Sequence, residues 1–409
     1  MDRPAILTPN ADLWLTGGLS ILVLLPLALA SSFVTENLLE WVVIGTVVVN
    51  IPHIMGSYRL LYSSKELVER HRFSAIWFPA MLGAVCVGAT IAAGTGTSVV
   101  PLYGVHIGAV AYLAIHYVGQ TWGMMATFAQ LEGVPFSAEE RRDLLLSLRY
   151  IMAWHLCWVA HHFVPVLKDS ALVDWIYEAM TAGLAISMAA GAYLLFQHAR
   201  RHGRRPPARI VVPWLANHVW YLLMALIPAA APAVQVAHAL QYLPFVVRVE
   251  MNRADALPPE VVMGKAVRQA LGFLIAGLVC LLILPHWINP RPLPLWVGLR
   301  PATIAVVCVP LALGLLLAQR GGQASKMKVH LLSLGLVLLI AGGLADWFLA
   351  PATALFAVEV LGADADLLRL GTTVSAFLSL HHYITDGVLW KLRSQDVRRQ
   401  LFAHLPARA

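Results

Sequence analysis

Long apolar runs separated by short polar segments dominate the chain. Twelve of these runs are long enough to cross a hydrocarbon core about 30 Å thick as helices. We therefore predict an all-α fold, a polytopic helical membrane bundle of about twelve transmembrane helices that forms a single domain over residues 1–409. The expected spans are 12–34, 38–62, 74–95, 99–126, 147–167, 172–196, 211–231, 232–249, 266–285, 296–318, 328–349 and 367–391.

Two segments outside the spans carry structural signals of their own. Ser137 is followed by Glu139 and Glu140, a pattern typical of a helix N-cap, so we expect an interfacial helix before span 147–167. The apolar stretch 351–363 is too short to span and predicts a re-entrant or interfacial helix on the outer side.

Composition and charge agree with a membrane protein. The chain is 59% hydrophobic and only 12% charged, whereas soluble domains carry about 25% charged residues. The basic residues that give the net charge of +7 are unevenly distributed between the two sides of the expected membrane. With twelve spans, all but four of the 29 Lys and Arg residues lie on the side of the termini, the exceptions being Lys168, Arg291, Arg300 and Arg369. The positive-inside rule then predicts that both termini are cytoplasmic, and no nucleic-acid partner is expected.

The polar positions inside the apolar runs are mostly histidines at one depth. Six of them lie roughly 7 to 11 residues from the expected cytoplasmic end of their span, which at about 1.5 Å per residue places them near the middle of the membrane. They are His53, His116, His155, His218, His238 and His382.

A buried imidazole in a membrane is costly without a partner, and intramembrane ionisable residues are functional candidates. Because neutral imidazole binds iron, copper and zinc, six such residues in one layer indicate a metal site. Each histidine could instead hydrogen-bond to a neighbouring helix, and this alternative stays open for single residues, His218 above all. We expect an inner bundle of histidine-bearing helices, at about 38–62, 99–126, 147–167, 211–249 and 367–391.

Several of these histidines have polar neighbours at helical spacing. Gln120 is four residues after His116, and Asp386 is four residues after His382, so each pair shares a helix face. Asp386 is placed either to ligate a metal or to accept the second N–H of a ligand. Further chemistry-bearing neighbours are Tyr242, four residues after His238, the pair His161 and His162, and His381.

Four motifs, in order along the chain, resemble the bacterial β-carotene dioxygenase family of the Brp/Blh type. They are Pro52-His53, Ile115-His116-Tyr117 with Gly119, His238 with Phe245 and Arg248, and His381 with Asp386. The stretch from His155 to His162 is similar to a further histidine cluster of that family. This chain departs from the pattern in its greater length, in its extra His382 and in the Tyr-Val-Gly that follows His116.

The resemblance implies a bacterial inner-membrane, multi-pass non-haem iron oxygenase that uses dioxygen on an apolar, lipid-dissolved substrate such as a carotenoid or polyene. We expect one Fe(II) ion on which His53, His116, His238 and His381 or His382 converge. His155, His161 and His162 could hold a second ion, because eight or more histidines exceed the needs of one. An electron donor is left open. Asp386, Gln120 and Tyr242 are the expected supporting residues of the site. The expected metal ligands are His53, His116, His155, His161, His162, His218, His238, His381 and His382.

Two other functions compete with this prediction. Paired histidines on facing helices ligate haem axially, as in electron-transfer or oxidase-like membrane proteins. A metal or solute transporter would instead carry titratable groups along a path through the whole membrane, and the histidines here thin out toward the cytoplasmic ends of the spans.

Overall fold

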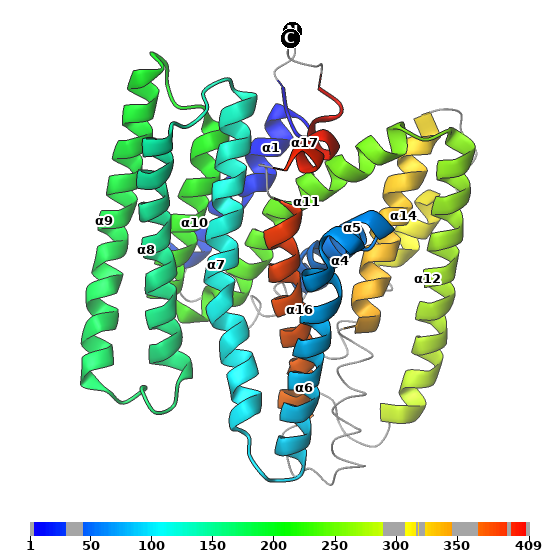
Figure 1. The fold of residues 1–409 in the computed structure, drawn as a ribbon, viewed down its shortest axis with the longest axis horizontal. Coiled ribbons are helices and arrows are strands. Elements are labelled where there is room, and N and C mark those ends of the chain that lie inside the picture. Colours follow the sequence, from blue (N-terminus) through cyan, green and yellow to red (C-terminus); the bar gives the residue numbers. More distant parts are fainter. Residues whose placement is uncertain are drawn as a thin grey trace.

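The computed structural model describes residues 4–29, 44–288, 307–315, 318, 324–345, 367–390 and 394–405. Within these residues the chain forms helices joined by turns, and no strand occurs (Figure 1). The longer helices are α2 (Leu19–Leu29), α4 (Ile51–Leu61), α6 (Phe78–Gly94), α7 (Val100–Leu131), α8 (Ala138–Phe163), α9 (Ala171–Arg201), α10 (Ala208–Leu226), α11 (Ala231–Asp255), α12 (Pro259–Ile288), α14 (Ala324–Gly343) and α16 (Leu367–Leu389). The short ones are α1 (Pro9–Leu13), α5 (Lys65–Arg70), α17 (Gln395–Phe402), the π-helical turns η1 (Trp14–Gly18), η2 (Thr46–Asn50) and η3 (Phe73–Trp77), and the 3-10 turn η4 (Pro228–Ala230).

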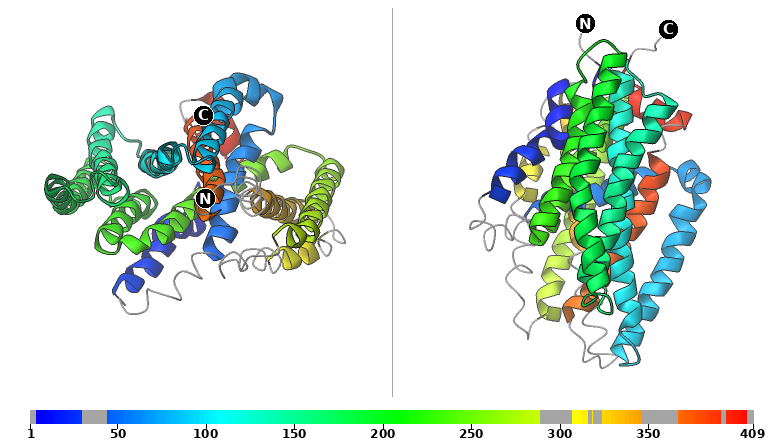
Figure 2. Two further views of the ribbon diagram at one scale, coloured as in Figure 1. Left: turned by 90° about the horizontal axis from the view of Figure 1, so that it is seen from below. Right: turned by 90° about the vertical axis from the view of Figure 1, so that its left-hand side faces the viewer.

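The helices pack in three groups, a central one and one on each side of it. α8, α9 and α10 lie on one side of the molecule and α12 and α14 on the other, with α4, α6, α11 and α16 between them (Figures 1 and 2). α7 connects the groups because it packs against α8 and α10 as well as against α16. The centre of the bundle is therefore built by α4, α7, α11 and α16.

Five of the described helices are long and apolar enough to cross a membrane. They are Phe73–Gly94, Val100–Leu131, Ala171–Arg201, Ala208–Leu226 and Lys326–Gly343. Large apolar side chains on them face outward, for example Met81 and Ile186, which are 60% and 71% exposed. The described part is thus an all-helical bundle with membrane-like helices. Parts of the expected spans 12–34, 38–62, 266–285, 296–318, 328–349 and 367–391, and the whole stretch 351–363, lie outside the residues whose side chains are described.

The N-cap expected at Ser137 begins a longer helix than predicted. Ser137 Oγ accepts a hydrogen bond from Glu140 N, and the Glu140 carboxylate accepts one from Ser137 N, which completes a capping box. The helix that follows is α8, which runs without a break to Phe163. The separate interfacial helix was therefore a wrong prediction, because its residues are the first turns of the span itself.

Two irregular turns set the direction of inner helices. Gly17 has φ 155°, and a Cβ there would lie 2.8 Å from Ala216 Cβ, so the chain passes closely over α10 at this point. The π-helical turn η2 ends where the Ile51 N–H bonds to the Thr46 carbonyl. Pro52 follows within the first turn of α4, where its missing N–H is tolerated. His53 thus lies in the first turn of a helix whose N-terminal half is buried.

Candidate metal centre

Three central helices bring three histidines and one aspartate together. His53 lies on α4, His116 on α7, and His382 and Asp386 lie on α16. One ligand atom from each residue lies within 4.8 Å of the other three, and all four residues are buried. We call these four residues the His/Asp cluster. Imidazole and carboxylate are ligands that transition metals accept, so the cluster could hold a metal ion.

The shortest contact of the cluster joins two imidazoles. His53 Nε2 lies 2.8 Å from His382 Nε2, although the two residues are 329 positions apart. Two nitrogens bound at right angles to one metal, each at about 2.0–2.1 Å, are themselves about 2.9 Å apart. The observed spacing therefore fits two neighbouring ligands of one ion.

Asp386 uses its two carboxylate oxygens differently. Oδ1 accepts hydrogen bonds from Ser57 Oγ at 2.5 Å and from Tyr242 OH at 2.9 Å. Oδ2 has no hydrogen-bond partner and lies 3.6 Å from His382 Nε2 and 3.9 Å from His116 Nε2. One oxygen is thus anchored, and the other is directed at the imidazoles.

The cluster holds polar atoms that nothing in the described protein satisfies. His116 Nε2 and Asp386 Oδ2 are buried and lack hydrogen bonds. The ion-pair partners of Asp386 within the described residues are His116 and His382, with no Lys or Arg among them. Buried polar groups are normally paired, and an unmet group of this kind calls for an explanation such as a bound ion. A cation would satisfy these atoms together.

His238 of α11 lies beside the cluster. Its ring centroid is 4.9 Å from that of His116 and 5.4 Å from that of His53. Both of its nitrogens are buried without a hydrogen bond. The ring stacks on Tyr117 at 3.8 Å, and its nitrogens are not part of the set that lies within 4.8 Å. The structure therefore brings His53, His116 and His382 together, and His238 lies beside them.

The other supporting residues also lie near the cluster. Gln120 donates a hydrogen bond to the His238 carbonyl at 3.2 Å, and its own side-chain oxygen is buried without a partner. Of the adjacent pair on α16, His382 joins the cluster, whereas His381 Nε2 contacts the Ser74 carbonyl at 2.8 Å. The expected pairing of His381 with Asp386 is therefore not formed, and His382 lies beside Asp386 one helical turn away instead.

Tyr242 forms the centre of a hydrogen-bond network that sequence reasoning found only in part. Its hydroxyl contacts Ser57 Oγ at 2.6 Å, Asp386 Oδ1 at 2.9 Å and Trp390 Nε1 at 2.7 Å. Its ring meets that of His53 edge-on at 4.4 Å. Ser57 and Trp390 were missed, although each is four residues from a predicted site residue, His53 and Asp386 respectively. That spacing was the available signal.

The structure does not bring the remaining predicted ligands to the cluster. His155 Nε2 lies 2.9 Å from the Val110 carbonyl. At the far end of α8, His161 Nε2 lies 3.1 Å from Asp174, and the His162 ring packs 4.5 Å from that of His161. His218 contacts Ser147 Oγ and the Trp214 carbonyl. The simple alternative, a hydrogen bond to a neighbouring group, describes His155 and His218.

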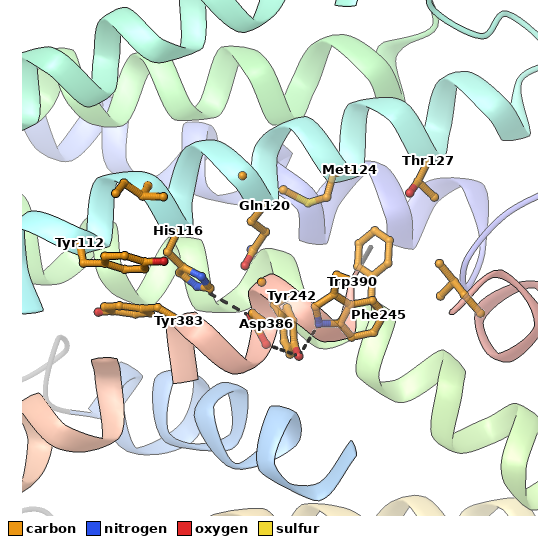
Figure 3. A pocket seen from close by; sticks show the side chains of 15 residues that line it. Tyr112, His116, Gln120, Met124, Thr127, Tyr242, Phe245, Tyr383, Asp386 and Trp390 are labelled. Carbon is orange, nitrogen blue, oxygen red and sulfur yellow. Dashed lines mark hydrogen bonds and ion pairs between the residues drawn. The ribbon is translucent and has the colours of Figure 1, made fainter. Parts of the chain in front are cut away.

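A cavity of about 290 Å³ borders the cluster and runs along α7 (Figure 3). His116, Asp386 and Tyr242 form part of its wall. Tyr112 and Tyr383 stack against each other at one end, with their ring centroids 6.1 Å apart. The opposite end is lined by Thr127, Phe245, Trp390 and Leu401. The wall is mainly apolar and aromatic, with the cluster's polar groups at one place, which is typical of a ligand site.

Comparisons with protein families, with curated proteins and with solved structures gave no match. Function must therefore be argued from the site itself.

Proposed function

We propose that this protein is a membrane metalloenzyme, a non-haem iron oxygenase that acts on an apolar molecule dissolved in the lipid bilayer. The observation that carries the proposal is the His/Asp cluster, with four buried ligand atoms within 4.8 Å of one another. The donor set supports iron because two or more histidines with one carboxylate are the ligands of non-haem Fe(II) oxygenases.

The carotenoid or polyene substrate is supported by two independent arguments. The resemblance to β-carotene dioxygenases includes Pro52-His53 and Ile115-His116-Tyr117, and two of these histidines are in the cluster. The cavity beside the cluster is walled by aromatic and apolar side chains such as Tyr112, Tyr383 and Phe245. An apolar molecule gains free energy by packing there, at about 25 cal/mol per Å² of apolar surface removed from water.

Each residue of the proposed site would have its own role. His53, His116 and His382 would hold the ion through ring nitrogens, with His238 as a further candidate ligand. Bound Fe(II) would supply open coordination positions for dioxygen and for redox chemistry. Asp386, anchored through Oδ1 by Ser57 and Tyr242, would direct its free oxygen Oδ2 at the ion. Gln120 presents an unpaired buried oxygen to the cavity, where it can accept a hydrogen bond.

The geometry weighs against the haem alternative at this site. Axial haem ligands lie on opposite sides of the iron, so their nitrogens are about 4 Å apart for bonds of about 2.0 Å. His53 Nε2 and His382 Nε2 are only 2.8 Å apart, and the rings of His116 and His238 crowd the same space. The spacing of these two nitrogens is therefore too short for the two axial ligands of one haem.

We also propose twelve spans, cytoplasmic termini and a bacterial inner-membrane location. The distribution of Lys and Arg supports the orientation. The two ends of the described chain support an even number of spans, because His404 Nε2 lies 2.8 Å from the Ala5 carbonyl. Reporter fusions at residue 409 and within 199–205 should both report the cytoplasm, and a periplasmic signal at either would overturn the topology.

Elemental analysis of the detergent-purified protein tests the proposal directly. We expect iron in stoichiometric amount in the wild type and none in His382→Ala. Oxygen uptake should then depend on a carotenoid supplied in mixed micelles, with oxygenated product detected by chromatography. An iron-free protein after anaerobic Fe(II) loading, or a strong haem Soret band, would overturn the non-haem assignment.

A further inference from the structure

The cavity beside the His/Asp cluster reaches the outer surface of the bundle between α7 and α16. Three of its wall residues on these helices are exposed, namely Ile115, Gly119 and Gly387. Ile115 is 45% exposed, while its neighbour His116 is buried and faces the cavity. α7 is one of the helices that are long and apolar enough to cross a membrane. An opening halfway along such a helix faces lipid rather than water.

Glycines keep this opening clear. A Cβ added to Gly119, Gly123 or Gly387 would meet no heavy atom within 4 Å. All three residues line the cavity. Their lack of a side chain is therefore not required by close helix packing, and the space that they leave belongs to the cavity and its mouth.

The opening between α7 and α16 leads to buried polar groups that make no hydrogen bond. His116 Nε2 and Asp386 Oδ2 are buried, without hydrogen-bond partners, and belong to residues of the cavity wall. Figure 3 shows both side chains directed into the space between α7 and α16. A molecule that passes the three glycines would thus come next to the proposed metal ligands.

The shape of the cavity indicates which kind of molecule can enter it. On α7 its wall extends from Tyr112 to Thr127, which at about 1.5 Å per residue is roughly 22 Å. The cavity is therefore elongated along this helix. An elongated, mainly apolar cavity fits a linear chain better than a compact molecule.

We propose that a linear apolar molecule enters sideways from the bilayer, between α7 and α16, through a portal formed by Gly119, Gly123 and Gly387. This inference rests on the proposed function for the apolar nature of the ligand. The glycines act by leaving space, so any side chain that fills the space should exclude the ligand without disturbing the metal ligands.

Photolabelling with an octadecyl probe that carries a terminal diazirine tests the portal. In wild-type protein the label should appear in peptides that contain residues 112–127 and 383–390. Gly119→Leu and Gly123→Leu should reduce it by about tenfold, which corresponds to roughly 1.4 kcal/mol, and Gly119→Ala should reduce it less. Both changes favour the helical state, and metal content measured on the same samples should be unchanged.

The matched control is Gly108→Leu on the same helix. Gly108 is also exposed, and a Cβ there also meets nothing within 4 Å, but it does not line the cavity. Equal labelling of all variants would overturn the portal and leave the proposed function intact. Metal-loaded wild type that takes up no label in these peptides would overturn the apolar ligand and the portal together.

Discussion

The His/Asp cluster and the histidines of α8 contain the same type of side chain in neighbouring helices, yet they use it differently. In the cluster, His53, His116 and His382 turn ring nitrogens toward one another and toward Asp386. On α8, His155 contacts a backbone carbonyl, and His161 contacts Asp174, whose side chain is 49% exposed. The comparison shows that buried histidines differ in what their nitrogens face: other imidazoles and a carboxylate in the cluster, a backbone carbonyl or a half-exposed carboxylate on α8.

The largest expected effect is the loss of one cluster imidazole. His382→Ala removes the nitrogen that lies 2.8 Å from His53 Nε2, so metal content should fall by more than the roughly 10–100-fold typical of an outer partner. His155→Ala should retain its metal. Elemental analysis of both purified variants gives the comparison. If the two variants lose metal equally, the distinction between the two regions fails.

Asp386→Asn should produce the next largest effect. The amide keeps the shape of the side chain but removes the negative charge beside His116 and His382. We expect a decrease of about 10–100-fold in metal affinity, measured by anaerobic Fe(II) titration of metal-free protein. Asp174→Asn is the matched control on α9, where affinity should not change. An unaltered titration curve for Asp386→Asn would contradict its role.

Removing the imidazole of His155 should affect stability instead of metal binding. The His155 side chain is buried and its hydrogen bond to the Val110 carbonyl is partly buried, so His155→Ala should lower the free energy of unfolding by about 1–3 kcal/mol. His116→Leu should cause no such loss in metal-free protein, because His116 Nε2 makes no hydrogen bond that could be lost. Thermal unfolding of metal-free samples distinguishes the two. A large loss for His116→Leu would indicate a structural role.

The smallest effect concerns His198, a third kind of histidine that pairs with Glu140 on the predicted cytoplasmic side. Burial alone would raise the pKa of Glu140. The hydrogen bonds from the Ser137 N–H and from His198 outweigh this effect, so the pKa of Glu140 lies below the ordinary 4.5. Its stabilising contribution is then present above pH 4.5 and decreases as the pH falls below that value.

Glu140→Gln keeps a side chain that suits a capping box and removes the charge. We expect a loss of about 1 kcal/mol or less at neutral pH, and a smaller difference from wild type at pH 4 than at pH 7. Unfolding curves at the two pH values provide the measurement. A difference that grows on acidification would reverse the assigned sign.

The sequence permitted prediction of the helical fold, and of the spacing that places Asp386 one turn from His382 on one helix. It did not predict which face of each helix turns inward. His381 and His382 are adjacent, and only packing against Tyr58 and Ser74 directs His381 away from the cluster. His155 belongs to the same predicted set, but its helix turns the ring toward the Val110 carbonyl.

The sequence also did not predict where the backbone is irregular. The π-helical turn before Pro52 and the close approach at Gly17 arise from contacts between segments far apart in the chain. The glycines of the portal carry no local signal either, since a glycine in an apolar helix serves equally for close packing, as at Gly191 beside Trp214, or for open space, as at Gly123.

The 329 residues between His53 and His382 also have a consequence for biosynthesis. At about 5–20 residues per second, the ribosome needs roughly 15 to 65 s between the two. During that time the His53 imidazole in the nascent chain lacks its partner His382. Assembly of the centre therefore depends on α16, the last of the long described helices, so a chain released before that helix is made would lack two of the four cluster residues.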